Sequence, residues 1–399
     1  MKKKLTYYEF FAGGGLVRAS LGLNWTCLFA NDICVKKAAS YRKNWGGKEL
    51  AISDVADIDC NQLPGSPNLI WASFPCQDFS LAGNGAGLSG SRSSTFWPFM
   101  NLMVKLKNTG RAPQIIALEN VLGTLSSNGG SDYRAIMSSL CDLGYKVGSV
   151  VIDASLFVPQ SRKRLFMIAV RDDFRIPDCH TNSPDIRWHP SSLQSCYSKL
   201  EDEYRSKWVW WSVPKPKARK LKLVDILEDD NSVLKWDTQA QTNALLGMMN
   251  TRHSKRVSMA VEATDRQAGA LYKRIRVEDG QRYQRAEVRF DGLAGCLRTP
   301  SGGASVQSIL VTHNGVIKSR RLTEREAARL MGLRESYKLP ESFTEAYHLM
   351  GDGVAVPVVR HLRRHIFEPI LRLNDSKDIN GTIFTQSSMR QIDRMALVN

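Results

Sequence analysis

A cysteine directly follows a proline just beyond a short apolar run. The run, residues 68–72 (NLIWA), is typical of a buried strand, and it leads into Pro75-Cys76-Gln77. An ionised thiol is a strong, soft nucleophile, and cationic neighbours favour its ionisation. A lone cysteine is more often a small core residue. The position of Cys76 at a strand end among polar residues favours the nucleophile instead.

Two later segments carry residues that could work with this thiol. Another apolar run ends in Glu119-Asn120, and a carboxyl group there could hydrogen-bond or protonate a nitrogen heterocycle. The turn VPQSRKRLF then contains Arg162 and Arg164, which point to the same side if the segment is extended. Taken alone, a solvated carboxylate and a solvated basic turn would be the simpler interpretations.

A glycine turn follows the first expected strand. In FFAGGGLVRASLGL, the glycines at 13–15 let the backbone turn tightly and approach a ligand at the start of the next helix. The second strand leads to Asp32, where nucleotide-binding sheets place an acid for ribose hydroxyls. Asp54 and Val55, after a third strand region, are expected beside an adenine ring. These three strand ends indicate one adenosine site, which could belong to NAD or to S-adenosylmethionine.

Short β-rich runs alternate with amphipathic helical patterns up to about residue 178. This rhythm is typical of βαβ units and a mostly parallel sheet, whose carboxyl edge binds ligands. The last two strands follow one another without a helix, so one of them should be antiparallel. The expected strands are Leu5–Phe10, Thr26–Ala30, Leu69–Ala72, Ile115–Leu118, Gly148–Ile152 and Leu165–Val170, and the expected helices are Val35–Asn44, Thr95–Lys107 and Asp132–Leu143.

The alternation stops after residue 178, and a segment rich in Trp, Arg and Lys follows, as in KWVWWSVPKPKARKLKL. We therefore predict a catalytic, cofactor-binding domain of residues 1–178 and 344–373. A second, smaller domain with its hinge would occupy residues 179–343, and the tail 374–399 has no assigned role. Regular secondary structure is expected again where Thr323 and Glu326 predict a capping box. Val358–Leu373 is expected to be an amphipathic helix.

The composition is that of an ordinary globular protein with excess positive charge. An apolar content of 43% and a charged content of 24% exclude a mostly disordered chain, and 399 residues exceed the usual size of a single core. Lys and Arg outnumber Asp and Glu by 55 to 39, which favours a polyanionic partner such as nucleic acid. The scattered cysteines predict free thiols in a reducing cytoplasm and no metal site. No apolar run approaches the roughly 20 residues of a membrane span.

Taken together, the motifs resemble the DNA (cytosine-5)-methyltransferase family, bacterial type. FAGGG, SFPCQDFS, ENV, QSRKR, LTEREAARLMG and GDGVAVPVVRHL occur in the order and approximate spacing of that family, over residues 5–373 apart from 179–295. The resemblance implies a Rossmann-like α/β core that uses S-adenosylmethionine, mostly parallel with one antiparallel strand. It also implies a smaller, irregular target-recognition domain. The expected reaction is methyl transfer to carbon-5 of a flipped-out cytosine within a short specific sequence of double-stranded DNA.

The resemblance also implies a role for each motif residue. Cys76 would add to carbon-6 of cytosine, and Glu119 would hold and protonate the ring nitrogen. Arg162 and Arg164 would grip the base and its flanking backbone. The family more often has asparagine at the position of Asp352. The residues expected to bind the cofactor are Phe11, Gly13, Gly15, Asp32, Asp54, Val55, Pro75, Asp352 and Gly353.

Two other functions remain open at this point. A tRNA cytosine-5 methyltransferase could share the same core, but it would be expected to lack a long insert such as residues 179–310. A catalytically inactive DNA-binding relative would not need Cys76 and Glu119 to be intact. A cognate restriction endonuclease system is a further partner that the resemblance allows. We expect a monomer in the bacterial cytoplasm, associated with the nucleoid and not with a membrane.

Overall fold

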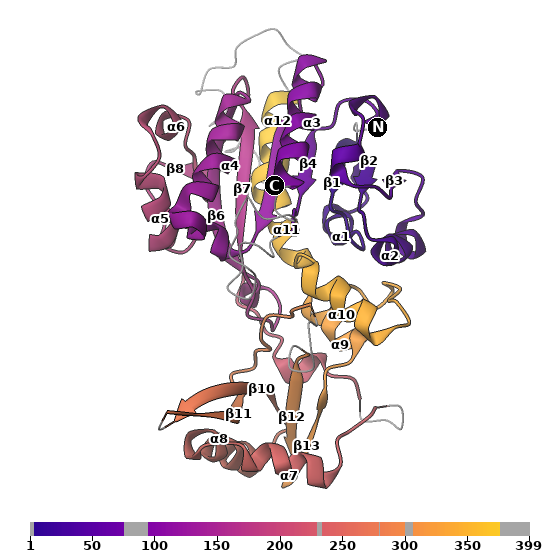
Figure 1. Cartoon of the computed structure of the whole chain (residues 1–399), viewed down its shortest axis with the longest axis vertical. Coiled ribbons are helices and arrows are strands. Elements are labelled where there is room, and N and C mark those ends of the chain that lie inside the picture. The colour runs from indigo at the N-terminus through magenta and orange to yellow at the C-terminus, as the bar shows by residue number, and fades with distance from the viewer. Residues whose placement is uncertain (1–3, 76–94, 230–233, 279, 300–305, 376–399) are drawn as a thin grey trace, which may run out of the picture.

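The larger part of the chain is built on a seven-stranded sheet. The computed structural model describes residues 4–75, 95–229, 234–278, 280–299 and 306–375. The strand order is β3-β2-β1-β4-β5-β7-β6, and only β7 runs antiparallel to its neighbours (Figure 1). The predicted fold class and its single antiparallel strand are therefore confirmed. The strands are β1 Leu5–Phe10, β2 Trp25–Asn31, β3 Leu50–Ala51, β4 Leu69–Ala72, β5 Ile115–Asn120, β6 Tyr145–Asp153 and β7 Lys163–Arg171.

Helices cover both faces of this sheet because its strands are apolar on both sides. Side chains alternate along a strand, so Tyr7 joins the core with α1 and α11 whereas Tyr8 joins the core with α3 and α4. The predicted helix Val358–Leu373 is interrupted by a π-helical turn at Arg363–Phe367. The helices are α1 Leu16–Leu21, α2 Val35–Trp45, α3 Phe96–Asn108, α4 Ser131–Asp142, α11 Val356–Leu362 and α12 Glu368–Asp375.

The residues that follow β7 pack on the same sheet. The backbone N–H of Val209 donates to the carbonyl of Val147 at 2.9 Å, and Trp211 Nε1 donates to the carbonyl of Ile168 at 3.2 Å. Trp188 and Trp211 are fully buried in the core of the large sheet. Residues 188–211 therefore lie with the first unit, although the sequence analysis assigned them to the second domain. Residues 180–211 contain β8 His180–Thr181, α5 Ser191–Ser198, α6 Asp202–Ser206 and β9 Trp210–Trp211.

The second unit is a four-stranded antiparallel sheet in the order β11-β10-β12-β13. Two helices cover one of its faces and enclose a small core that includes Leu245, Val257, Leu271 and Leu310. The uneven spacing of apolar residues in this part of the sequence did not reveal so regular a sheet. Its elements are α7 Gln239–Gly247, α8 Thr251–Glu262, β10 Gln267–Glu278, β11 Gln281–Arg289, β12 Ser308–His313 and β13 Val316–Arg321.

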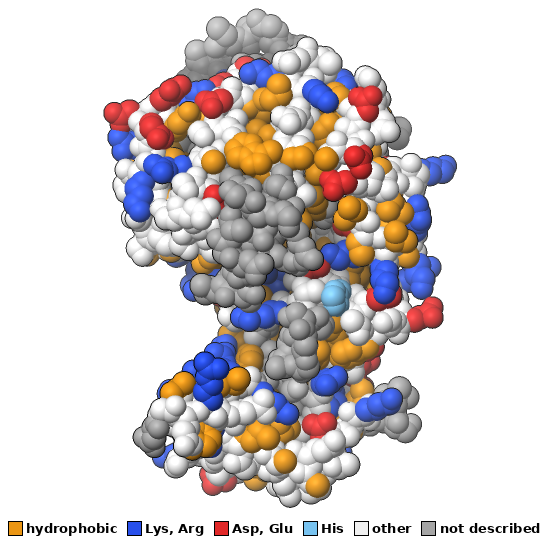
Figure 2. Space-filling model, viewed as in Figure 1, with side chains coloured by type: hydrophobic (Ala, Val, Ile, Leu, Met, Phe, Trp, Pro, Cys, Tyr) orange, Lys and Arg blue, Asp and Glu red, His pale blue; other side chains and the backbone are white. Residues whose placement is uncertain are grey.

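Two helices, α9 Glu324–Leu330 and α10 Phe343–Asp352, lie between the two units (Figure 1). The predicted capping box at the start of α9 is confirmed: the Thr323 side chain accepts from the backbone N–H of Glu326. Figure 2 shows a narrow waist at this level, with basic side chains around it. Within the described residues, no helix is both long and apolar enough to cross a membrane.

Replacing Gly148 by alanine is expected to destabilise the first unit. A Cβ at this position of β6 would overlap the carbonyl oxygen of Val209, so one of the two backbones must shift. Overpacking of this kind costs about 1–3 kcal/mol, and we expect the melting temperature to fall by several degrees. Gly247→Ala is the control, because no atom lies within 4 Å of its added Cβ. Equal melting temperatures for the two variants would contradict the packing of residues 207–211 on β6.

Candidate active site

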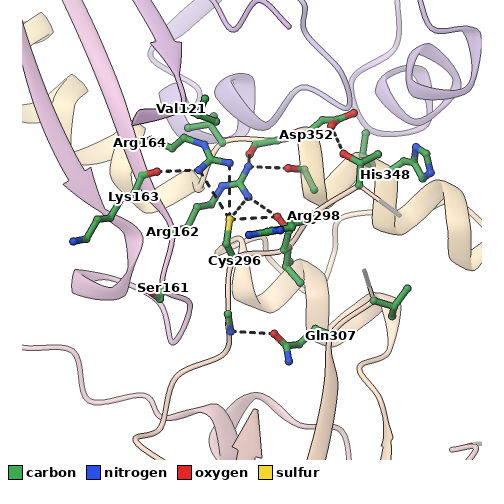
Figure 3. Close-up of a pocket in the computed structure, with 18 of the residues that line it drawn as sticks. Val121, Ser161, Arg162, Lys163, Arg164, Cys296, Arg298, Gln307, His348 and Asp352 are labelled. Atoms are coloured by element: carbon green, nitrogen blue, oxygen red, sulfur yellow. Dashed lines mark hydrogen bonds between the residues drawn. The ribbon is translucent and has the colours of Figure 1, made fainter. Parts of the chain in front are cut away.

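A cavity of about 2290 Å³ opens between the two units, at the carboxyl ends of the parallel strands. It contains the glycine turn after β1, the ends of β2, β4 and β5, the start of β7 and the segment at the end of α10 (Figure 3). The residues predicted from the sequence that line this cavity are Phe11, Gly13, Asp32, Pro75, Glu119, Arg162, Arg164, Asp352 and Gly353.

Three predicted residues, Gly15, Asp54 and Val55, are not among the described residues that line the cavity. Cys76 lies outside the described residues, directly after Pro75. Gly15 is the N-cap of α1 with a φ of 75°, and a Cβ there would overlap the indole of Trp45. The Asp54 carboxylate accepts from the backbone N–H of Ala56 at 2.9 Å and so caps a short helix. Val55, in that helix, is buried in the core beneath α3.

The glycine turn is fixed by side chains from three other elements. Asp32 Oδ2 accepts from the backbone N–H of Gly13 at 2.7 Å, and Oδ1 accepts from that of Cys34 at 2.8 Å. The carbonyl of Gly14 accepts from Trp45 Nε1 at 2.9 Å and from the Tyr337 hydroxyl at 2.8 Å. A Cβ on Gly14 would overlap that hydroxyl, so this position requires glycine. The Asp32 carboxylate thus shapes the turn, and its other lone pairs remain for a ligand.

Glu9 is a cavity residue that the sequence analysis missed. It is 1% exposed, and its Oε2 has no hydrogen-bond partner among the described residues. Burial raises the pKa of Glu9 to about 8, although the nearby Arg18 guanidinium and the backbone N–H groups of Val17 and Arg18 act in the opposite direction. The signal in the sequence was an acid within the otherwise apolar and aromatic strand LTYYEF. A buried carboxyl oxygen without a partner, on a cavity wall, is suited to a cationic or hydrogen-bond-donating ligand.

Asp352 ties three segments together at the cavity edge. Its Oδ2 pairs with Lys37 Nζ of α2 at 2.6 Å, and its Oδ1 accepts from the Thr299 hydroxyl at 2.6 Å. Burial would raise the pKa of Asp352, but the charge of Lys37 and the hydrogen bonds from Lys37 and Thr299 outweigh it and lower the pKa. Ile33 lines the same region with a 64% exposed side chain and was also missed. Sequence patterns did not reveal that this isoleucine is left uncovered.

Glu119 and Arg164 form an ion pair at the junction of β5 and β7. The distance from Arg164 Nε to Glu119 Oε1 is 3.1 Å, and the side chains are 15% and 7% exposed. Both residues line the cavity. The antiparallel pairing of the two strands brings together residues that are far apart in the sequence. The pair presents an oriented carboxyl group to the cavity that Pro75 also lines.

Arg162 has a different environment from Arg164. Its guanidinium donates to the carbonyl oxygens of Leu297 at 2.9 Å, Gly351 at 2.8 Å and Gly353 at 2.7 Å, and the residue is 2% exposed. Burial, together with the charge of Arg164, lowers the pKa of Arg162. This arginine therefore fixes the segments around the cavity, and most of its donors are already used.

A second thiol, Cys296, lies beside both arginines (Figure 3). Its Sγ is 3.3 Å from Arg162 Nη1 and 4.0 Å from Arg164 Nη1 and Nη2. Burial alone would raise the pKa of Cys296, but the two guanidinium groups outweigh it and lower the pKa below the usual range. The sequence analysis missed this residue because only the fold brings Cys296 to the arginines.

The fold and the cavity define an α/β protein that binds a nucleotide-like ligand at its strand ends, with a second sheet facing the same cleft. A family model, C-5 cytosine-specific DNA methylase, matches residues 5–368. The chain belongs to this family. It is a DNA (cytosine-5)-methyltransferase that uses S-adenosylmethionine.

Individual proteins similar to this chain agree with the family. The type II methyltransferase M.HpaII of Haemophilus parainfluenzae is 25% identical over 383 residues, which cover 94% of this chain and 92% of the relative. M.HhaI of Haemophilus parahaemolyticus is 23% identical over 365 residues, which cover 91% and 94%. Among solved structures, the S. pombe Dnmt2 methyltransferase matches 92% of this chain and 99% of its own, with a TM-score of 0.57 and 17% identity. This structural likeness concerns the fold.

Glu9→Gln should change how stability depends on pH. The pKa of Glu9 is about 8 in the folded chain and 4.5 ordinarily, so the wild type loses stability as the pH rises from about 4.5 to 8. The glutamine variant lacks this loss, and its advantage should grow by at most about 1.4 kcal/mol per pH unit.

Urea unfolding at pH 5, 6, 7 and 8 would measure this difference. Glu341→Gln is the control, because the Glu341 side chain is 95% exposed and should leave the pH dependence unchanged. A constant difference between Glu9→Gln and the wild type at all four pH values would contradict the expected protonation of Glu9.

Proposed function

We propose that this enzyme methylates carbon-5 of a cytosine flipped out of double-stranded DNA, within a short specific sequence, through a covalent bond to Cys76. One observation carries the proposal: the Glu119–Arg164 pair, Pro75 and the glycine turn line a single cavity. A nucleophile that follows Pro75, a carboxyl group for the base and a cofactor site would then be within reach of one another.

The described residues fit S-adenosylmethionine. The Glu9 oxygen without a partner suits the cofactor's ammonium group, and free lone pairs of Asp32 suit its ribose hydroxyls. Ile33 offers an exposed apolar side chain to the adenine ring. At Gly13 an added Cβ would meet no atom of the described residues within 4 Å. When bound, this cofactor supplies an electrophilic methyl group.

The chemistry on the base follows from the low reactivity of cytosine carbon-5. Addition of the Cys76 thiolate to carbon-6 makes carbon-5 nucleophilic, so one difficult step becomes two easier ones. Glu119 donates a proton or hydrogen bond to the ring nitrogen, which prevents negative charge from accumulating during addition. After methyl transfer, a base removes the carbon-5 proton and the electron pair expels the Cys76 thiolate.

Arg164 and Arg162 would serve this reaction in different ways. Arg164 is 3.1 Å from Glu119 and orients that carboxyl group toward the base. Arg162 keeps the segment around Leu297 and Gly351 in place, so it is a positioning residue. The resemblance assigned both arginines to the base. Their contacts support different roles, in which Arg164 orients Glu119 and Arg162 positions the neighbouring segments.

Double-stranded DNA must deform for this chemistry, because a stacked base cannot enter a cavity between the two units. Flipping costs a few kcal/mol, which contacts between protein and DNA must supply. The net charge of +16 supports phosphate contacts that are independent of sequence. Because similar proteins are named type II methyltransferases, we propose a restriction–modification setting with a cognate endonuclease. A monomer suffices, since one chain supplies both walls of the cavity.

DNA that carries 5-fluorocytosine at the target position should trap the enzyme. Fluorine cannot leave as a proton does, so the bond from Cys76 to carbon-6 should persist. We expect a complex that survives denaturing electrophoresis and forms only with S-adenosylmethionine present.

Cys76→Ser should abolish this complex, whereas Cys296→Ser should still form it, because Cys296 is held by the two arginines. Methylation of the unmodified duplex without any adduct on the fluorinated one would overturn the covalent mechanism.

A further inference from the structure

The second unit carries a two-stranded ribbon that extends beyond its sheet. β10 pairs with β12 only over Gln267–Leu271, whereas it pairs with β11 as far as Glu278. We define the ribbon as residues 272–278 and 281–287. Most of its side chains beyond residue 272 are exposed on both faces. Figure 1 shows β10 and β11 projecting sideways from the second unit, beneath the waist.

One face of this ribbon is rich in arginine. Side chains alternate along a strand, and residues paired across an antiparallel ladder share a face. Arg274 is paired with Arg285, and Arg276 with Tyr283. We call these four residues the arginine face. The opposite face carries Lys273, Ile275, Val277, Arg282 and Gln284.

The arginine face lies on the side of the first unit. The opposite face continues into Leu271 and Val288, which pack in the small core that also includes residues of α7 and α8. On the side of the arginine face, Ala270 instead belongs to the core that joins the two units. Tyr272 and Arg274 line the cavity, together with Leu271 and Lys273 from the other side of the ribbon. A duplex with its target base in the cavity would therefore pass beside this face.

Neighbouring side chains hold Arg274 and Arg276 in place but leave some of their N–H donors free. Glu287 Oε1 accepts from Arg276 Nε at 2.6 Å, and its Oε2 is 3.4 Å from Arg274 Nε. The Arg274 guanidinium also lies over the Tyr272 ring, 5.4 Å from its centroid. A guanidinium has five N–H donors, so a carboxylate on one edge leaves others available. Such preorganisation lowers the entropy cost of a further contact.

The shape and spacing of the ribbon match the major groove of B-DNA. That groove admits a two-stranded β-ribbon, and an arginine bonded to guanine O6 and N7 is the commonest specific contact in it. Two residues along a strand span about 6.8 Å, and two base-pair steps also span about 6.8 Å. Arg274 and Arg276 share a face at this spacing.

We infer that the ribbon enters the major groove and that Arg274 and Arg276 read guanines in the recognition sequence. The inference rests on the proposed function and deepens it. Arginines that contacted only phosphates would add affinity without sequence preference.

Mapping of methylated cytosines separates these two roles. The wild type, Arg274→Ala and Arg276→Ala would each be expressed in a methylation-free host, and 5-methylcytosine would be mapped at single-base resolution. Each variant should methylate additional sequences that differ from the wild-type sequence at a guanine position. Discrimination there should fall about 5- to 150-fold, the equivalent of one bidentate base contact.

Two further variants test whether the effect depends on this face of the ribbon and on the guanidinium group. Arg282→Ala, on the opposite face of the same ribbon, should keep the wild-type recognition sequence. Arg276→Lys keeps the charge but loses the planar pair of donors, so it should relax specificity as Arg276→Ala does.

An unchanged recognition sequence in Arg274→Ala and Arg276→Ala, with weaker methylation at every site, would overturn the inference. So would wild-type specificity in Arg276→Lys. A wild type that leaves no 5-methylcytosine would instead contradict the proposed function itself.

Discussion

The buried guanidinium of Arg162 is the contact on which the shape of the cleft depends. A charged group in a 2% exposed position is costly unless hydrogen bonds satisfy it. Here the carbonyl oxygens of Leu297, Gly351 and Gly353 and the thiol of Cys296 provide the partners. Arg162 immediately precedes β7 of the large sheet, and its partners come from the segment that contains Leu297 and from the end of α10. This side chain therefore connects the walls of the cavity.

The cofactor side of the cavity depends on the same region. Asp352, next to Gly351 and Gly353, pairs with Lys37 of α2 and accepts from Thr299. A Cβ on Gly353 would overlap Leu16 at the start of α1, so the segment also packs closely on the helix that follows the glycine turn. The wall that would hold the base and the wall that would hold the cofactor thus meet at three consecutive residues. A displacement there would move both sites together.

The sequence was informative where local patterns determine structure. Apolar runs and helical periodicity predicted the strands and helices of the large sheet, and their order predicted which strand ends meet. The sequence did not predict the role of Arg162, because its partner Gly351 is 189 residues away and only the folded chain brings the two together. The tryptophan-rich segment of residues 188–211 was assigned to the second domain because its spacing is irregular, whereas Trp188 and Trp211 belong to the core of the large sheet. Exposure of Ile33 and isolation of Glu9 Oε2 are likewise properties of packing and not of periodicity.

Two buried acids of the cavity, Glu9 and Glu119, have different electrostatic surroundings, and this difference separates their tasks. Glu119 has the Arg164 guanidinium 3.1 Å away, which fixes the carboxyl group in one orientation for a directional contact with a base. Glu9 has an oxygen without a partner among the described residues, and burial, which outweighs the nearby Arg18 charge, raises its pKa to about 8, so it is mostly protonated near neutral pH. A cation bound beside Glu9 would favour its ionised form and would gain more there than at a carboxylate already paired with arginine. In the proposed function, a cationic cofactor therefore belongs beside Glu9, and the base belongs beside Glu119.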